Sequence, residues 1–126
     1  YANYTHTISE ADLAYRDWST IPGQAGDVGN LGLSYEKYGL TARISGNYRS
    51  KMLTGVGDLP KFDRYADENL RIDFTSTYEV NKFMSVYVNI MNLTNERDRS
   101  YMGSKRRPTY VEYYGVSGNA GLKFNL

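Results

Sequence analysis

Leu40–Arg49 reads LTARISGNYR, and at every step its side chains alternate between an apolar, small or aromatic set and a polar set. Because successive side chains of a β-strand point to opposite faces, this period of two predicts an amphipathic strand. The apolar face would carry Leu40, Ala42, Ile44, Gly46 and Tyr48, and the polar face Thr41, Arg43, Ser45, Asn47 and Arg49.

The same period of two recurs along the chain. It is found in residues 31–36, 70–77, 84–90 and 114–126, and more weakly in residues 1–9. These segments approach the roughly 9 to 11 residues of a bilayer-crossing strand, whereas strands of soluble domains average about five or six. The sequence predicts an all-β chain of about six long amphipathic strands.

The connections between these segments alternate in length. Lys37-Tyr38-Gly39 and Val80-Asn81-Lys82 are short and predict tight turns, the first helped by its glycine. The connections 10–27, 50–68 and 96–109 are long, polar and charged. This alternation places every tight turn at one end of the sheet and every long loop at the other. The predicted fold is an antiparallel up-and-down meander, the layout of an outer-membrane β-barrel.

The composition excludes several classes of site. With 15 basic and 14 acidic side chains the formal net charge is +1, which gives no case for nucleic acid as a partner. The chain has no cysteine and one histidine, His6, so disulfides, a thiol nucleophile and a multi-histidine metal site are excluded. We expect no metal, no cofactor and no enzymatic activity. Because the chain begins at Tyr1, we expect a fragment or a mature segment.

Tyrosine is unusually frequent, at 13 of 126 residues, and its placement favours a membrane. Tyr35, Tyr78 and Phe124 fall at the tight-turn ends of the apolar faces, and Tyr48 and Tyr114 lie nearer the long-loop ends. Two rings of aromatics around an aliphatic band are typical of the lipid-facing surface of a barrel. We predict a lipid-facing surface that includes Leu40, Ile44, Tyr48, Ile72, Phe74, Tyr78, Tyr114 and Phe124.

Several strings, taken in order, resemble the late strands of TonB-dependent outer-membrane receptors. They are Asn3-Tyr4-Thr5, residues 29–39, Asn47-Tyr48-Arg49-Ser50, Arg71-Ile72-Asp73, Asn92-Leu93-Thr94-Asn95-Glu96, and Tyr114-Gly115 with residues 121–124. One departure is that Asn125 and Leu126 follow Phe124, where that family usually ends on an aromatic residue.

The resemblance implies a receptor with an N-terminal plug inside a 22-stranded barrel, which imports ferric siderophores, cobalamin or oligosaccharides with energy from TonB. Residues 1–126 would be the C-terminal portion of that barrel, without the plug, the TonB-contacting stretch or a signal peptide. The implied partners are the remainder of the barrel and the plug, TonB through the missing N-terminal part, outer-membrane lipid and the small-molecule ligand. The implied location is the outer membrane of a Gram-negative bacterium, with long loops extracellular and short turns and the C-terminus periplasmic.

This layout divides the candidate site residues into two groups. Arg43, Arg49, Arg71 and Asp73, together with Glu79, would face the lumen, where they would either contact a plug or pair with one another across strands. Ligand contacts are expected in the long loops, because aromatic rings stack on sugars or catecholates and guanidinium groups bind anions. The loop candidates are Tyr15, Arg16, Trp18, Arg97, Arg99 and Tyr101, and Lys105-Arg106-Arg107 would either meet lipopolysaccharide phosphates or be solvated.

Two other readings stay open at this level. A secreted β-sandwich would bury the apolar faces against each other and bind carbohydrate through its loops. A small barrel enzyme such as a lipid hydrolase would depend on His6, although no nucleophile motif accompanies that residue.

Overall fold

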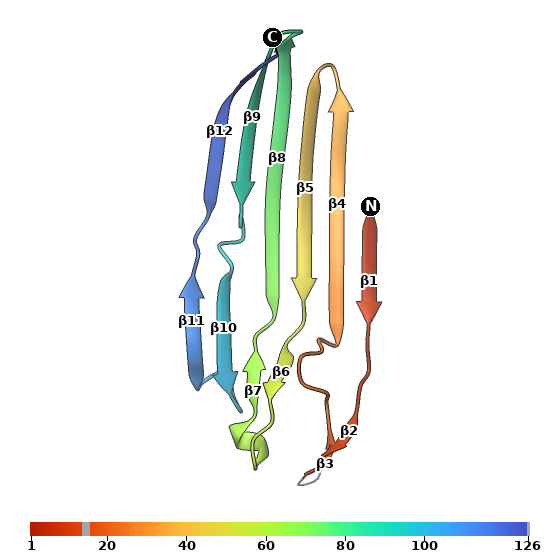
Figure 1. Cartoon of the computed structure of the whole chain (residues 1–126), viewed down its shortest axis with the longest axis vertical. Coiled ribbons are helices and arrows are strands. Elements are labelled where there is room, and N and C mark those ends of the chain that lie inside the picture. The colour runs from red at the N-terminus through yellow and green to blue at the C-terminus, as the bar shows by residue number, and fades with distance from the viewer. Residues whose placement is uncertain (14–15, 126) are drawn as a thin grey trace.

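The computed structural model describes residues 1–13 and 16–125, with the side chains of residues 13 and 16–18 left out. It is an all-β chain built on a six-stranded antiparallel sheet whose strands lie side by side in chain order (Figure 1). The strands are β1 (Ala2–His6), β4 (Asp27–Lys37), β5 (Leu40–Arg49), β8 (Asn69–Asn81), β9 (Met84–Met91) and β12 (Ser117–Phe124). The predicted all-β class and antiparallel meander are confirmed.

The long connections differ from the prediction, because they fold into hairpins instead of irregular loops. We call these the distal hairpins: β2 (Ala11–Leu13) with β3 (Arg16–Ser19), β6 (Met52–Gly55) with β7 (Arg64–Ala66), and β10 (Arg97–Met102) with β11 (Pro108–Tyr113). A 3-10 turn, η1 (Pro60–Phe62), lies between β6 and β7. β7 also pairs with β10, which joins two hairpins into a sheet ordered β11-β10-β7-β6.

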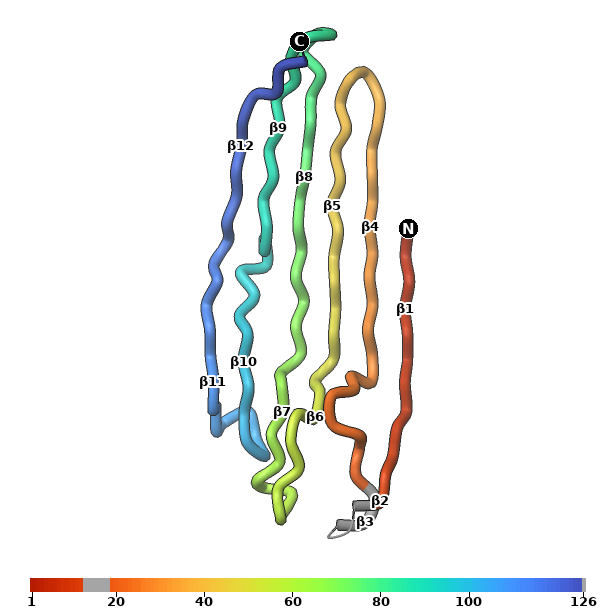
Figure 2. The backbone as a smooth tube through the Cα atoms, in the orientation of Figure 1, coloured from red at the N-terminus to blue at the C-terminus, as the bar shows by residue number. Residues whose placement is uncertain are grey.

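Figures 1 and 2 show this second sheet end to end with the first, so that the chain continues from β5 into β6 and from β9 into β10. The N-terminus lies at mid-height beside β4, because β1 covers only the lower half of that strand. The sheet is therefore elongated along its strands.

The two tight turns follow from local backbone chemistry. Tyr38 and Gly39 both have positive φ angles, of 56° and 75°, as the favoured two-residue hairpin turn requires. The second turn comes later than predicted, because β8 continues to Asn81 with a register shift after Glu79. The Asn81 side-chain oxygen then accepts a hydrogen bond from the Phe83 N–H at 2.9 Å and closes the turn.

The described strands form one layer. All the strand pairs that make extensive contact are hydrogen-bonded neighbours, and none is a pair packed face to face among the described residues. Leu53 and Tyr101 are the buried apolar side chains of the described part, each 5% exposed. The accessible surface of 8918 Å² exceeds the about 6,800 Å² expected of a compact monomer of this mass. A β-sandwich needs a second sheet over the apolar face, and the described residues do not provide one.

Among the described residues, no helix has the length and apolar character needed to cross a membrane.

Candidate functional site

The apolar side chains of the six-stranded sheet gather on one face. Strand register places them in continuous rows, so that Leu33 lies opposite Ile44 and Ile44 lies opposite Phe74. This apolar face consists of Ala2, Tyr4, Leu31, Leu33, Tyr35, Leu40, Ala42, Ile44, Tyr48, Leu70, Ile72, Phe74, Tyr78, Val86, Val88, Ile90, Ala120, Leu122 and Phe124.

Much of the apolar face is open in the isolated chain. The exposed members of this face range from 40% exposure for Tyr48 to 70% for Leu33, and its central members, such as Ile72, Phe74 and Val88, are half-buried. Aromatic residues lie at both ends of the face, with Tyr35, Tyr78 and Phe124 near the tight turns. Apolar patches larger than a few hundred Å² are rare on soluble monomers, so this face is built to be covered.

The opposite face carries the predicted charged residues. Arg43, Arg49, Arg71 and Asp73 all lie on it, because Arg43 pairs with Thr75, Ser45 with Asp73, Asn47 with Arg71 and Arg49 with Asn69. We call it the polar face. The Arg43 guanidinium lies 5.1 Å from the ring centroid of Tyr1, and that ring covers the Gly32 backbone so closely that an added Cβ would clash with it.

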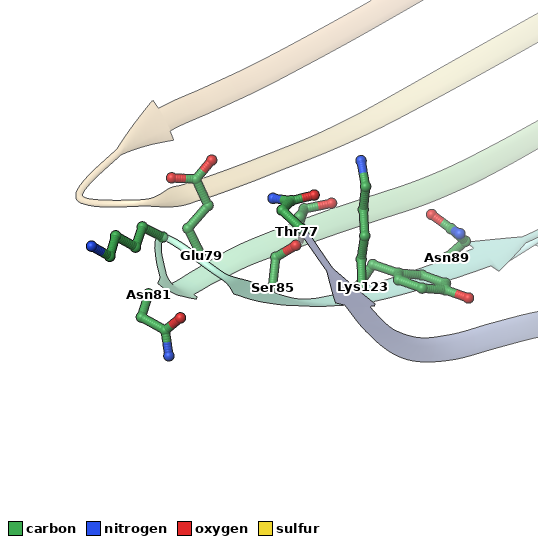
Figure 3. A pocket seen from close by; sticks show the side chains of 9 residues that line it. Thr77, Glu79, Asn81, Ser85, Asn89 and Lys123 are labelled. Atoms are coloured by element: carbon green, nitrogen blue, oxygen red, sulfur yellow. The ribbon is translucent and has the colours of Figure 1, made fainter.

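The polar face is hollowed near the tight turns. This hollow has a volume of about 410 Å³ and holds one carboxylate, Glu79, and two ammonium groups, those of Lys82 and Lys123 (Figure 3). Glu79 and Lys123 project to the same side, on either side of Ser85. No ion pair joins these charges among the described residues. The residues that line this hollow are all polar, whereas sites for small organic ligands are mostly apolar. The hollow is therefore typical of a hydrated surface and not of a ligand site.

Charged residues pair with one another where the two sheets meet. The Lys105 Nζ atom lies 2.8 Å from Asp67 Oδ1 and 2.7 Å from Glu68 Oε1, and Arg99 lies 3.8 Å from Asp67. The hydrogen bonds that Lys105 donates to Asp67 and Glu68 raise the pKa of Lys105 above its ordinary value. Arg99, predicted as a ligand contact, and Lys105, predicted either to meet phosphates or to be solvated, both lie against carboxylates of their own chain.

The Asn92-Leu93-Thr94-Asn95 string ties several strands together. Asn92 is 4% exposed, and its Nδ2 donates to the backbone oxygens of Glu96 and Gly115, both at 2.9 Å. Its Oδ1 accepts from the Glu96 N–H at 2.8 Å, and its own N–H donates to Asp73 Oδ1 at 2.9 Å. The side-chain amide of Asn92 is therefore fully used in hydrogen bonds within the fold.

The aromatic loop candidate Tyr101 is a core residue. Its ring stacks on Tyr65 with a centroid separation of 5.4 Å and an interplanar angle of 21°. The sequence prediction treated 96–109 as an exposed loop, and pairing of β10 with β7 buries the ring instead. Arg97 remains at the surface, where its Nη1 donates to the Tyr113 hydroxyl at 3.1 Å. Tyr15 and the side chains of Arg16 and Trp18 lie outside the described residues.

Tyr114 does not continue the apolar face of β12. Gly115 has a φ of 72°, which interrupts the alternation, and β12 begins only at Ser117. Tyr114 instead lines a cavity of about 360 Å³ with Arg71 and Asp73, and its hydroxyl donates to Glu112 at 2.6 Å. The predicted position of Tyr114 among the residues of the apolar face is wrong for this reason.

Sequence reasoning missed Asp27. The Asp27 Oδ1 atom accepts from the Tyr4 hydroxyl at 2.6 Å and lies 2.7 Å from His6 Nδ1, because β1 and β4 pair in that register. Only knowledge of this pairing would have found the contact. Among the described residues no hydroxyl hydrogen-bonds to the His6 ring, so the structure assembles no serine nucleophile beside it.

The described residues include no group of three or more side chains arranged to hold a metal ion. Comparisons of the chain with protein-family models, with curated proteins and with solved structures give no match.

Proposed function

We propose that this chain is the C-terminal part of the barrel of a TonB-dependent outer-membrane receptor, which imports a ferric siderophore, cobalamin or an oligosaccharide with energy from TonB. The observation that carries the proposal is the continuous apolar face on a one-layered antiparallel sheet. Bilayer lipid would cover that face, and the polar face would line the lumen. The choice of transported ligand rests on the sequence resemblance alone.

The free edges of the sheet support an incomplete barrel. Within the described part, β1 pairs only with β4, and β12 pairs only with β9. Each edge strand leaves backbone N–H and C=O groups without partners, and in hydrocarbon each such group costs several kcal/mol. A spanning sheet must therefore close, and even small bacterial barrels use about eight strands. The proposal assigns the missing strands to the remainder of the receptor.

The distribution of charge along the strands fits the same orientation. The ion pairs formed by Asp67, Glu68, Arg99 and Lys105 lie beyond the ends of the six long strands, towards the distal hairpins. In the proposed arrangement the hairpins extend outside the cell, and the two tight turns face the periplasm. Charged side chains then avoid the hydrocarbon, where they are costly.

The test is whether the polypeptide enters the outer membrane. The chain is expressed in a Gram-negative host alone and within its native polypeptide, and membranes are washed with urea to remove peripheral protein. The proposal expects the native polypeptide in the washed outer-membrane fraction and the isolated chain in aggregates. A monodisperse monomer of the isolated chain without detergent would refute it and favour a module whose apolar face is covered by protein.

A further inference from the structure

Two arginines on the polar face have hydrogen-bond donors that the fold leaves unused. Arg49 lies opposite Asn69, and Arg71 lies opposite Asn47, which makes the two arginines diagonal neighbours on β5 and β8. The Nε atoms of both are buried and have no hydrogen-bond partner among the described residues. Buried donors are nearly always satisfied, so a partner from outside the described residues is expected.

The nearby carboxylates accept hydrogen bonds from groups other than the two guanidinium groups. Asp73 accepts the Asn92 N–H at 2.9 Å, and Asp98 accepts the Asn69 side-chain amide at 3.2 Å. Asp98 also lies 4.0 Å from the Arg71 Nη2 atom, beyond hydrogen-bond range. Arg49 makes one described side-chain contact, a 3.3 Å hydrogen bond from Nη2 to the Asp67 backbone oxygen. Asp73 and Asp98 balance the two guanidinium groups in charge, but among the described residues neither carboxylate accepts a hydrogen bond from them.

Space for a partner is present beside both guanidinium groups. A hollow of about 510 Å³ is lined by Arg49 and Arg71, by the amides of Asn30, Asn47 and Asn69, and by the carboxylates of Asp73 and Asp98. Guanidinium groups bind carboxylates and phosphates through pairs of parallel N–H bonds, and side-on binding uses the Nε–H. Amide groups supply further donors to the same anion.

The geometry points to an oxyanion-binding site formed by Arg49 and Arg71, with a carboxylate or phosphate group as its ligand. The inference rests on the sheet register and the unsatisfied donors, not on the membrane location. The oxyanion comes either from an acidic side chain of a segment seated on the polar face or from a small anion in solution. Arg43 lies on the same face but its guanidinium covers the Tyr1 ring, so it is a matched control.

The experiment follows the arginine Nε–H signals by NMR in the full chain with ¹⁵N-labelled arginine, kept in detergent micelles. Inorganic phosphate is the probe, acetate is the carboxylate probe, and chloride at equal ionic strength is the reference. We expect the Arg49 and Arg71 signals to shift and saturate with phosphate, and Arg49→Gln or Arg71→Gln to weaken binding about ten-fold. Arg43→Gln is expected to change it by less than about two-fold.

The wild-type titration decides the inference even if a variant fails to fold. The site would be overturned if phosphate and acetate shifted the Nε–H signals no further than chloride does. It would also be overturned if the Arg43, Arg49 and Arg71 variants all lost the same amount of phosphate affinity. Repeating the titration on the native polypeptide separates the sources. If the Arg49 and Arg71 signals of the native polypeptide already differ from those of the isolated chain and do not respond to phosphate, the oxyanion is an internal acidic side chain. If these signals still shift with added phosphate, the oxyanion is a small anion from solution.

Discussion

Ile44 and Ser45 provide a test of the proposal that the apolar face of the sheet meets lipid. They are adjacent at the middle of β5 and point to opposite faces. Ile44 is 44% exposed and lies between Leu33 and Phe74 on the apolar face. Ser45 lies on the polar face opposite Asp73. An arginine at either position adds the same charge, so the difference between Ile44→Arg and Ser45→Arg reports the environment of each face.

The magnitude follows from the position of Ile44 along its strand. Ten residues of β5 extend over ~31 Å, and a tilt near 45° reduces this to a height of about 22 Å. That height is close to the ~25 Å apolar band of outer-membrane barrels. Ile44, the fifth of these residues, then lies near the midplane, where a lipid-facing arginine costs about 2 to 4 kcal/mol. Ser45→Arg is expected to cost much less, because in the proposed barrel it would lie near Asp73 in a hydrated lumen.

The assay is equilibrium unfolding in guanidinium from phosphatidylcholine vesicles, with the native polypeptide as the parent protein. Ile44→Leu is the control for loss of shape without a charge, and Ile72→Arg with Thr75→Arg repeats the comparison on β8. Equal destabilisation by Ile44→Arg and Ser45→Arg would refute the reasoning, because it would mean that both faces of the sheet lie in a protein interior.

Three further predictions concern the regions beyond the long strands. Asn92→Ala is expected to lower the free energy of unfolding by about 3 kcal/mol, because it leaves buried backbone groups without hydrogen-bond partners. Denaturation midpoints measure this change, and an unchanged midpoint would contradict the structural role of the Asn92-Leu93-Thr94-Asn95 string. Hydrogen bonding to Glu112 raises the pKa of Tyr110 from 10.0 to about 12, so this contact contributes stability below pH 10.0 that is lost as pH rises through about 12. Tyrosinate absorbance should place the Tyr110 pKa nearer 10.0 in Glu112→Gln, and an unmoved titration would contradict the contact. Gly103→Ala should destabilise the protein more than Gly115→Ala does. Both glycines have positive φ, but only at Gly103 does an added Cβ clash with a backbone carbonyl of η1. Equal melting temperatures of the two variants would argue against this.

The period of two was sufficient to predict the sheet, because it is a property of each strand by itself. Ile44 and its neighbours define a face without any knowledge of their partners, and the order of short and long connections then fixes the meander. The same reasoning failed at Tyr114, where a single glycine with positive φ breaks the alternation. The same reasoning places the second tight turn too early in the chain. The register shift after Glu79 causes this error, because the residue types around Glu79 do not indicate such a shift.

The distal hairpins and the site contacts depend on pairing between distant segments. Tyr101 becomes a core residue only because β10 pairs with β7, which lies about 35 residues earlier in the chain. Asp27 meets His6 across 21 residues for the same reason. Short charged segments carry too few alternating positions to define a face, so the sequence predicts loops for residues 50–68 and 96–109.

The two tight turns also have a consequence for the order of folding. β4–β5 and β8–β9 each close over about two residues, whereas nineteen residues separate β5 from β8. Closing that longer connection costs about 2 kcal/mol more in chain entropy. Pairing of Met52 with Ala66 in the β6–β7 hairpin brings the ends of this connection together before β5 and β8 meet. The chain is thus expected to assemble from two locally formed hairpins, β4–β5 and β8–β9. The β6–β7 hairpin then holds these two hairpins in register.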